Sequence, residues 1–262
     1  MSDISRLLDL ESIRLDQPAD DWRDAIARAG ELLERQGAAT AEYTRAMIAN
    51  VEQNGPYIVV APGFAFAHAR SSDAVHRTAM SWVRLARPVV FGHASNDPVT
   101  LVVALSADDA KAHMRAMRDL ATLLSSPETR AALDRAGTPE EVLSVLTDGA
   151  PASGPEPAPT TTEAAGASRN KILTVCGNGL GTSLFLKNTL EQVLQRWGWS
   201  PYLTVEATDT ISARGKAKEA DLILTSGEIA RTLGDVGIPV KVIGNFTSTT
   251  EIDAAMRELY DV

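Results

Sequence analysis

The sequence contains only one cysteine, Cys176, among its 262 residues. A single thiol excludes an internal disulfide framework, so the expected setting is a reducing cytoplasm. The chain also lacks any run of about 18 apolar residues, so we expect no membrane-spanning helix and no direct membrane insertion. Its first residues, MSDISRLLDLESIRL, lack the basic flank, apolar stretch and small-residue cleavage site of a signal peptide, which predicts that the protein stays where it is made.

Positive charge is scarce as well. The chain has 25 Lys and Arg against 34 Asp and Glu, and its net charge is −9. Nucleic-acid binding needs clustered Lys and Arg that neutralise phosphates, so we expect no nucleic-acid partner. Four histidines are present, but no two of them have the i, i+4 or H-x-H spacing that suggests a metal site. We therefore expect neither a metal nor a cofactor, and we expect small molecules or proteins as partners.

One segment near the middle of the chain has no aromatic and no large aliphatic side chain. It covers residues 149–169, within the stretch DGAPASGPEPAPTTTEAAGASRN. Such a composition cannot bury enough apolar surface to offset its ordering entropy, which predicts a flexible linker. A buried loop is the alternative, but unstructured loops of this length are uncommon inside compact domains. We therefore expect two domains, at residues 1–148 and 170–262.

The second domain has four short apolar runs, each followed by a segment with helical periodicity: KILTV, YLTVEA, DLILTS and VKVIGN. Strands that alternate with helices predict an α/β domain with a parallel, four-stranded, doubly wound sheet. Ligands of such sheets bind beyond the carboxyl ends of the strands, and Cys176 lies at the carboxyl end of the first one. The topology therefore points to Cys176 as part of a binding site.

The first domain begins with helical patterns over 21–37 and 40–55, each ending near a glycine. Four strand-like runs come next: YIVVAP, FAFAHA, AMSWVRL and VTLVVAL. Two further helical patterns, AHMRAMRDLATLLSS and PEEVLSVL, close the domain. This order predicts an α/β/α domain with a mixed sheet, in which His68 ends a strand.

A glycine-rich stretch, CGNGLGTS, follows the first strand of the second domain and precedes a helix. Strand, loop and helix gather backbone N–H groups and the positive end of a helix dipole, which favours an anion. The same dipoles would lower the pKa of a thiol at the rim of the loop below its free value near 8.5. The pattern predicts that Cys176 accepts a phosphoryl group held by Gly177, Asn178, Gly179, Leu180, Gly181, Thr182 and Ser183.

Other interpretations of the glycine loop stay open. Cys176 could be an inert buried residue beside a tight turn. A dinucleotide site would need G-x-G-x-x-G; Thr182 replaces its third glycine, although Glu206 could act as the ribose-binding acid. A cysteine phosphatase would need C-x5-R-[ST], and Thr182 stands in place of that arginine. Without a guanidinium, hydrolysis is weakened, so the loop is better suited to passing a phosphoryl group on.

The histidines lie in the first domain. His68, in APGFAFAHARSSD, ends a strand among small residues that leave its ring accessible, and Arg70 could offset phosphoryl charge. His113 has helical spacing with Met117, Leu120 and Leu124, which predicts an inward-facing ring that could support the active histidine. The remaining two, His76 and His93, are predicted to be surface residues.

These motifs resemble the fused IIA and IIB components of the bacterial phosphoenolpyruvate-dependent sugar phosphotransferase system. In the first domain the resemblance is closest to the ascorbate-specific IIA protein, a relative of the mannitol and fructose type, through ESIRL, DWRDAI, VEQNGPYIVVAPGFAFAHAR and NDPVT. In the second, ILTVCGNGLGTSLFLK is similar to the IIB protein of the lactose, ascorbate and galactitol type.

The resemblance implies a phosphotransferase. It implies that the phosphocarrier HPr phosphorylates His68, which passes the group to Cys176, with His113 as the supporting second histidine. Cys176 would then deliver the group to L-ascorbate held by a membrane IIC component, giving L-ascorbate 6-phosphate. The protein would act in the cytoplasm, transiently at the inner face of the membrane through IIC. A phosphorylation-sensing regulatory pair, or the same relay for another sugar or polyol, are the alternatives.

The surroundings of the active histidine depart from the family pattern. The family usually has Pro-His-Gly there, whereas this chain has Ala67-His68-Ala69. Alanine in place of proline frees one backbone constraint, and alanine in place of glycine adds a methyl group. We expect the approach of HPr to be altered and phosphorylation of His68 to be retained.

Overall fold

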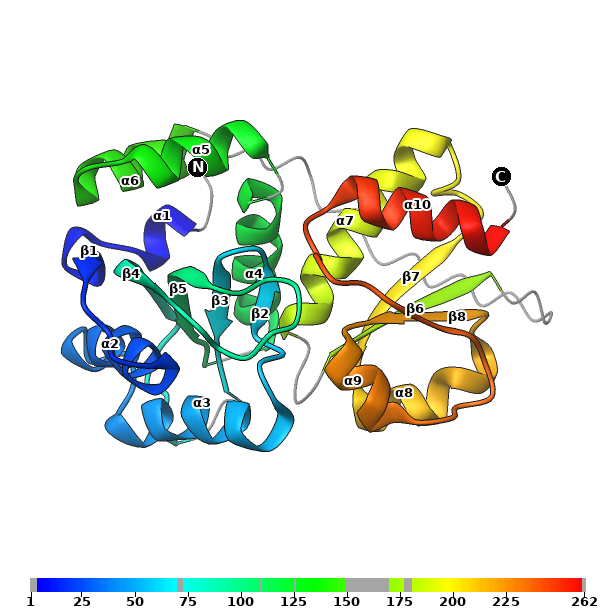
Figure 1. Cartoon of the computed structure of the whole chain (residues 1–262), viewed down its shortest axis with the longest axis horizontal. Coiled ribbons are helices and arrows are strands. Elements are labelled where there is room, and N and C mark those ends of the chain that lie inside the picture. Colours follow the sequence, from blue (N-terminus) through cyan, green and yellow to red (C-terminus); the bar gives the residue numbers. More distant parts are fainter. Residues whose placement is uncertain are drawn as a thin grey trace.

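The computed structural model describes residues 4–69, 73–108, 110–124, 126–148, 170–176 and 181–260, which build two separate sheets with helices on both faces (Figure 1). We call residues 4–148 the N-terminal half and residues 170–260 the C-terminal half. The predicted linker lies outside the described residues, so the domain boundaries and the flexibility of the linker stay predictions.

The N-terminal half contains a five-stranded sheet with the order β1-β4-β5-β3-β2. Its strands are β1 (Ile13–Gln17), β2 (Val59–Ala61), β3 (Phe64–Ala67), β4 (Ala79–Val89) and β5 (Val99–Ser106). Neighbours β4 and β5, and β2 and β3, are antiparallel, whereas β1 is parallel to β4 and β3 to β5. The sheet is therefore mixed, as predicted, with one more edge strand, β1, than the sequence indicated.

Alternate residues of the strands bury two cores on opposite faces of this sheet. Along β5, Leu101 and Val103 face one core, and Val102 faces the other. The helices that cover the two faces are α1 (Ile4–Leu7), α2 (Trp22–Arg35), α3 (Ala41–Asn54), α4 (Ala110–Leu124), α5 (Pro127–Arg135) and α6 (Pro139–Asp148). Helices α2 and α3 lie on one face and α1, α4, α5 and α6 on the other (Figure 1). Period-two alternation thus produces the expected α/β/α layering.

The C-terminal half is a four-stranded parallel sheet with the order β7-β6-β8-β9. Its strands are β6 (Lys171–Cys176), β7 (Thr204–Asp209), β8 (Leu222–Thr225) and β9 (Val240–Val242). Its helices are α7 (Gly181–Trp197), α8 (Thr210–Lys216), α9 (Gly227–Leu233) and α10 (Thr249–Tyr260). The predicted doubly wound architecture is confirmed: α7 and α10 lie on one face, and α8 and α9 on the other (Figure 1).

The two halves pack against each other through aromatic rings. Phe185 in α7 is fully buried, and its ring centroid lies 6.1 Å from that of Phe64 and 5.7 Å from that of Phe66, both in β3. Helices α4 and α7 run side by side at the centre of the molecule (Figure 1). We call this contact of the two halves the closed arrangement.

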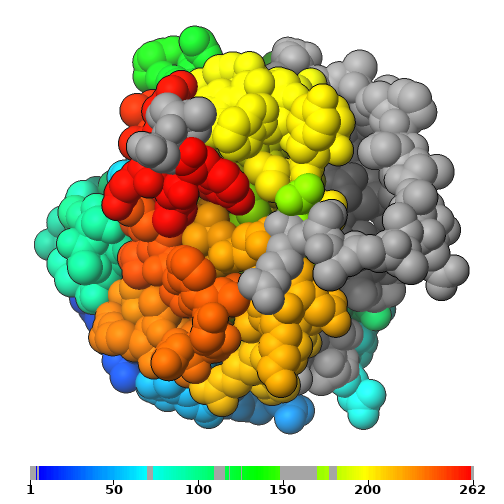
Figure 2. Space-filling model, turned by 90° about the vertical axis from the view of Figure 1, so that its right-hand side faces the viewer, coloured from blue at the N-terminus to red at the C-terminus, as the bar shows by residue number. Residues whose placement is uncertain are grey.

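Hydrogen bonds also join the halves. The Asn96 side chain donates from Nδ2 to the Val59 carbonyl at 2.9 Å and to the Gly244 carbonyl at 2.7 Å, one bond in each half. The Phe246 N–H donates to the Val60 carbonyl at 2.9 Å. Figure 2 shows the outer side of the C-terminal half, where its yellow to red segments face away from the joint. In the described ranges, no helix combines the length and the apolar character needed to cross a bilayer.

Candidate functional site

His68 directly follows β3, where its ring is held by the backbone of the strand. Its Nδ1 lies 3.1 Å from the Phe66 carbonyl oxygen. Because a carbonyl can only accept, Nδ1 carries the ring proton and Nε2 carries the lone pair. Burial lowers the pKa of His68, and the hydrogen bond to Phe66 only partly opposes this effect. The imidazole is therefore neutral near pH 7, with Nε2 as its nucleophilic nitrogen.

The backbone on both sides of His68 is fixed despite the loss of the family's proline and glycine. Ala67 is paired with Ala104 in the parallel ladder of β3 and β5. The Tyr43 hydroxyl accepts from the Ala69 N–H at 3.1 Å and donates to the Leu105 carbonyl at 2.7 Å. Burial raises the pKa of Tyr43 to about 12, so this hydroxyl keeps its proton.

Cys176 is the last residue of β6, and its sulfur meets the first turn of α7. Its Sγ lies 3.3 Å from Ser183 Oγ and 4.0 Å from the Thr208 carbonyl oxygen. Burial raises the pKa of the Cys176 thiol, while hydrogen bonds from Ser183 and Thr182 lower it. The expected net lowering of this pKa is therefore wrong in the closed arrangement, because desolvation outweighs the hydrogen bonds.

The structure brings the surroundings of His68 and Cys176 together across the joint. The Tyr57 ring lies edge-on to His68, with centroids 6.0 Å apart and an interplanar angle of 84°. Burial raises the pKa of the same Tyr57, and the charge of an ionised Cys176 raises it further, so Tyr57 lies near Cys176 as well as His68. Phe66 continues the contact, since its ring lies 5.5 Å from His68 and 5.7 Å from Phe185.

Two predictions of exposure are wrong. His68, expected to have an accessible ring, is 2% exposed, and Cys176, expected at the rim of a loop, is 1% exposed. The reason is the closed arrangement: the carboxyl end of β6 and the start of α7 point at the N-terminal half (Figure 1). His68 directly follows β3 and Cys176 ends β6, and both residues are buried near the joint of the halves.

His93, predicted to be a surface residue, is 8% exposed and lies at the joint. Its Nδ1 accepts from the backbone N–H groups of Ser95 and Asn96, at 3.3 and 3.1 Å. The ring proton is therefore on Nε2, which lies 4.0 Å from Glu228 Oε2 of the C-terminal half. His93 thus contributes to contact between the halves, whereas His76 is exposed, as predicted.

The structure describes some of the remaining predicted site residues and not others. Thr182 and Ser183 are buried in the first turn of α7, which begins at Gly181. His113 falls within α4, and three residues of its predicted stripe are buried: Met117, Leu120 and Leu124. The His113 side chain lies outside the described part, so its inward orientation and supporting role stay predictions. The other predicted phosphate-site residues lie outside the described residues, and their roles stay predictions: Arg70, Gly177, Asn178, Gly179 and Leu180.

Glu206 does not fit the role of a ribose-binding acid. Its carboxylate pairs with the Lys171 ammonium at 2.9 Å and also with Lys216. Partial burial raises the pKa of Glu206, but the hydrogen bonds from the two lysines outweigh this effect and lower it. A carboxylate engaged by two lysines in this way argues against the dinucleotide interpretation.

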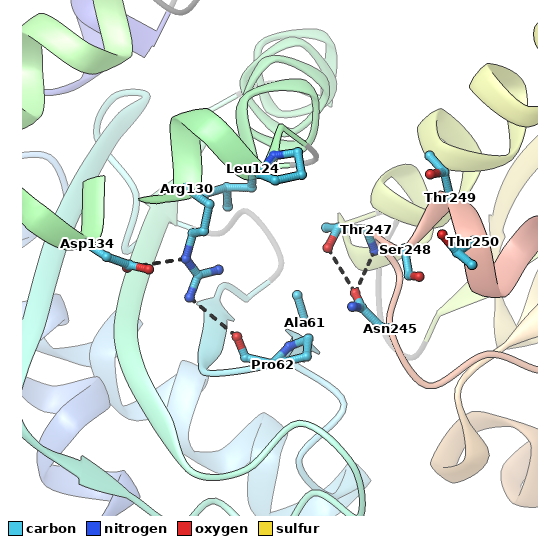
Figure 3. Close-up of a pocket in the computed structure, with 11 residues that line it drawn as sticks. Ala61, Pro62, Leu124, Arg130, Asp134, Asn245, Thr247, Ser248, Thr249 and Thr250 are labelled. Atoms are coloured by element: carbon cyan, nitrogen blue, oxygen red, sulfur yellow. Dashed lines mark hydrogen bonds and ion pairs between the residues drawn. The ribbon is translucent and has the colours of Figure 1, made fainter. Parts of the chain in front are cut away.

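A separate cavity of about 420 Å³ lies between the halves (Figure 3). Its lining comes from both halves: Ala61, Pro62, Leu124, Pro127, Arg130, Asp134, Asn245, Thr247, Ser248, Thr249 and Thr250. Arg130 is engaged there, because its guanidinium contacts the Pro62 carbonyl and Asp134, each at 3.4 Å. Neither His68 nor Cys176 lines this cavity. No group of three or more metal-ligating side chains occurs in the part of the chain described.

Three residues of the site were missed by sequence reasoning: Tyr43, Tyr57 and Phe185. Tyr57 and Phe185 stand in quoted motifs, GPYIVV and TSLFLK, but strand and helix periodicity indicates only that they are buried. Their role depends on which surface of the other half they meet. No local pattern of the sequence carries that information.

Comparisons with known proteins agree with the observed fold. A family model described as phosphoenolpyruvate-dependent sugar phosphotransferase system, EIIA 2, matches residues 6–149. A second one, described as PTS system, lactose/cellobiose specific IIB subunit, matches residues 171–258. Ascorbate-specific PTS system EIIA components of Shigella boydii and of Escherichia coli K12 are each 34% identical over 141 residues, covering 53% of this chain and 92% of theirs.

Solved structures also resemble the chain. PtxA from Streptococcus mutans is 33% identical with a TM-score of 0.52, over 57% of this chain and 95% of its own. The mannitol-specific cryptic phosphotransferase enzyme IIA CmtB from Escherichia coli is 30% identical with a TM-score of 0.51, over 55% of this chain and 98% of its own.

Proposed function

Because the chain belongs to the EIIA 2 family of the phosphoenolpyruvate-dependent sugar phosphotransferase system and carries a IIB segment as well, we propose that it relays a phosphoryl group from His68 to Cys176. One observation supports the proposal: His68, directly after β3, and Cys176, at the end of β6, are both buried near Tyr57 at the joint of the halves. HPr is the donor to His68, and a membrane IIC component presents the final acceptor.

The chemistry consists of three substitutions at phosphorus. His68 Nε2 attacks the phosphoryl group of phospho-HPr, and the bond from phosphorus to the HPr nitrogen breaks. The Cys176 thiol then loses its proton to solvent water, and the thiolate attacks while the Nε2–P bond breaks and returns its electron pair to Nε2. Finally a sugar hydroxyl attacks phosphorus and releases its proton to solvent, while the S–P bond breaks and Cys176 leaves as thiolate. The proton that stays on Nδ1 keeps the departing imidazole neutral, which supports the second step.

The closed arrangement serves only the middle step. HPr cannot reach a His68 that is 2% exposed, and IIC cannot reach a Cys176 that is 1% exposed. The halves therefore separate for the first and third steps and close for the second. Closure excludes water from the reacting groups, which protects a hydrolysable phosphoryl group while it is transferred. The predicted linker of about 20 residues would keep donor and acceptor at an effective concentration in the millimolar range.

L-ascorbate is the sugar we propose, because the relatives named above are ascorbate-specific components. The product would be L-ascorbate 6-phosphate, formed on the cytoplasmic side, where Cys176 meets IIC. The chain would then act in the cytoplasm and contact the membrane transiently through IIC.

The relay order is tested by incubating the protein with phosphoenolpyruvate, enzyme I and HPr, followed by peptide mass spectrometry. We expect His68→Ala to abolish labelling of both sites, and Cys176→Ser to leave His68 labelled. Labelling of Cys176 that survives the loss of His68 would contradict the relay.

The acceptor is tested separately with membranes that contain the IIC component. We expect the phosphorylated protein to lose its label to L-ascorbate and to retain it with mannitol. Transfer to mannitol instead would agree with the proposed relay and contradict L-ascorbate as its sugar. A label that no sugar removes would favour a phosphorylation-sensing regulatory pair.

A further inference from the structure

The hydroxyl of Tyr57 is buried in the closed arrangement without forming a hydrogen bond among the described residues. The residue is 2% exposed, and its Oη has no hydrogen-bond partner in the part of the chain that the structure describes. Buried hydroxyl groups are normally hydrogen-bonded, because an unpaired one loses its water without compensation. An unpaired hydroxyl in a packed joint indicates that its hydrogen-bond acceptor is a group that the protein binds only during the reaction.

Tyr57 lies where a phosphoryl group would pass. Its ring meets His68 edge-on, with the ring centroids 6.0 Å apart, and Cys176 is near enough that its charge, when ionised, adds to the effect of burial in raising the pKa of Tyr57. The backbone holds it there: the Tyr57 N–H donates to the Gly55 carbonyl at 2.9 Å, and the neighbouring Ile58 carbonyl accepts from Phe66 at 2.8 Å. The Tyr57 ring is thus held against His68 and near Cys176.

We propose that Tyr57 is a catalytic residue of the transfer within the chain, whose hydroxyl donates a hydrogen bond to a phosphoryl oxygen as the group moves from His68 Nε2 to Cys176 Sγ. Tyr57 forms and breaks no covalent bond and keeps its proton. The Nε2–P bond breaks, the S–P bond forms, and Tyr57 stabilises the negative charge on the oxygens between the two. This inference rests on the proposed relay.

The properties of the hydroxyl fit a donor and not a base. Burial raises the pKa of Tyr57, and the charges that Cys176 and Tyr43 carry when they are ionised raise it further, so Tyr57 stays protonated over the physiological range. A donor placed in a water-free site before reaction needs no reorganisation when charge moves past it. Phosphoryl transfer depends mainly on such positioning and charge stabilisation. Removing one preorganised donor typically slows a reaction by about 100-fold or more.

The test is Tyr57→Phe, which removes one oxygen and keeps the ring against His68. The protein is mixed with excess phospho-HPr, quenched at intervals, and the two phosphopeptides are quantified. We expect transfer to Cys176 to slow by about 100-fold. In a Cys176→Ser background, phosphorylation of His68 by HPr should change by less than about threefold, because that step occurs in the open form. Tyr202→Phe, at an exposed tyrosine, is the control and should behave as the unmodified protein.

Replacement of Tyr57 by 3-fluorotyrosine separates the hydroxyl from the packing. This variant keeps the donor and should retain transfer, while Tyr57→Phe should not. Transfer in Tyr57→Phe within about threefold of the unmodified protein would overturn the inference, and so would equal slowing in both variants. A failure of the relay itself would be visible differently, as unmodified protein in which Cys176 never acquires label.

Discussion

Replacing Phe185 by alanine should open the closed arrangement and expose Cys176. The Phe185 ring belongs to α7 of the C-terminal half, but it packs on Phe64 and Phe66 of the N-terminal half. It is fully buried, so the truncation leaves a cavity in the joint. Its effect should therefore fall on the contact between the halves.

The size of the effect follows from the burial. Truncating a buried phenylalanine to alanine costs about 3–5 kcal/mol, from lost apolar transfer and from the cavity. If about 3 kcal/mol of this weakens the joint, the open fraction rises by about 100-fold, since each 1.4 kcal/mol is a factor of ten. This holds as long as the open form is a minor one in the unmodified protein.

Alkylation of Cys176 by iodoacetamide measures the open fraction directly, because it is the only thiol in the chain. When opening and closing are fast relative to alkylation, the observed rate is proportional to the open population. We expect the unmodified protein to react slowly and Phe185→Ala to react about 100-fold faster, without loss of helical circular dichroism.

Ile223→Ala is the matched control. Ile223 is fully buried in β8 inside the four-stranded sheet, so its truncation should lower the melting temperature without changing the alkylation rate at 25 °C by more than about threefold. The reasoning is refuted if Cys176 of the unmodified protein reacts as fast as an unfolded thiol. It is equally refuted if Phe185→Ala leaves the rate unchanged.

Two further predictions concern the nucleophile and its support. Because burial raises the pKa of Cys176, thiolate is scarce at neutral pH, and transfer from His68 should speed up by about tenfold per pH unit below that pKa. A flat profile between about pH 6.5 and about pH 8.5 would contradict this. Tyr43→Phe removes bonds to Ala69 and Leu105 and should cost about 1–3 kcal/mol in thermal unfolding, whereas Tyr57→Phe should cost almost nothing. Equal losses would show that the Tyr57 hydroxyl is paired.

Much of the fold could be predicted because local patterns agree with the global arrangement. The four runs of the C-terminal half alternate with helices, and only a parallel sheet accommodates that order. Helix α5 was missed although its start carries ordinary signals: Ser126 caps the helix by accepting from the Thr129 N–H, and Pro127 stands at the first position. Strand β1 was missed because an edge strand of five residues with charged side chains has weak apolar alternation.

The sequence predicts which residues form the candidate site, but it does not predict how deeply they are buried. His68 and Cys176 each end a strand, and strand ends can be located from a sequence. Their burial cannot, because it comes from contact between segments more than 100 residues apart in the chain. His93 illustrates the same limit: its own loop is polar, and only the approach of Glu228 from the other half makes it a joint residue. Surface complementarity between halves has no local signature.

The burial of both nucleophiles at one joint affects the order in which partners bind and the rate at which the sugar is phosphorylated. In the proposed relay, the surface around His68 meets either HPr or the C-terminal half, and the surface around Cys176 meets either the N-terminal half or IIC. Two partners cannot occupy the same surface at once, because they would clash. HPr and the C-terminal half therefore bind the surface around His68 in turn, even when their affinities for it are equal. The rate at which the halves part is then an upper limit on sugar turnover, however fast the individual phosphoryl transfers are.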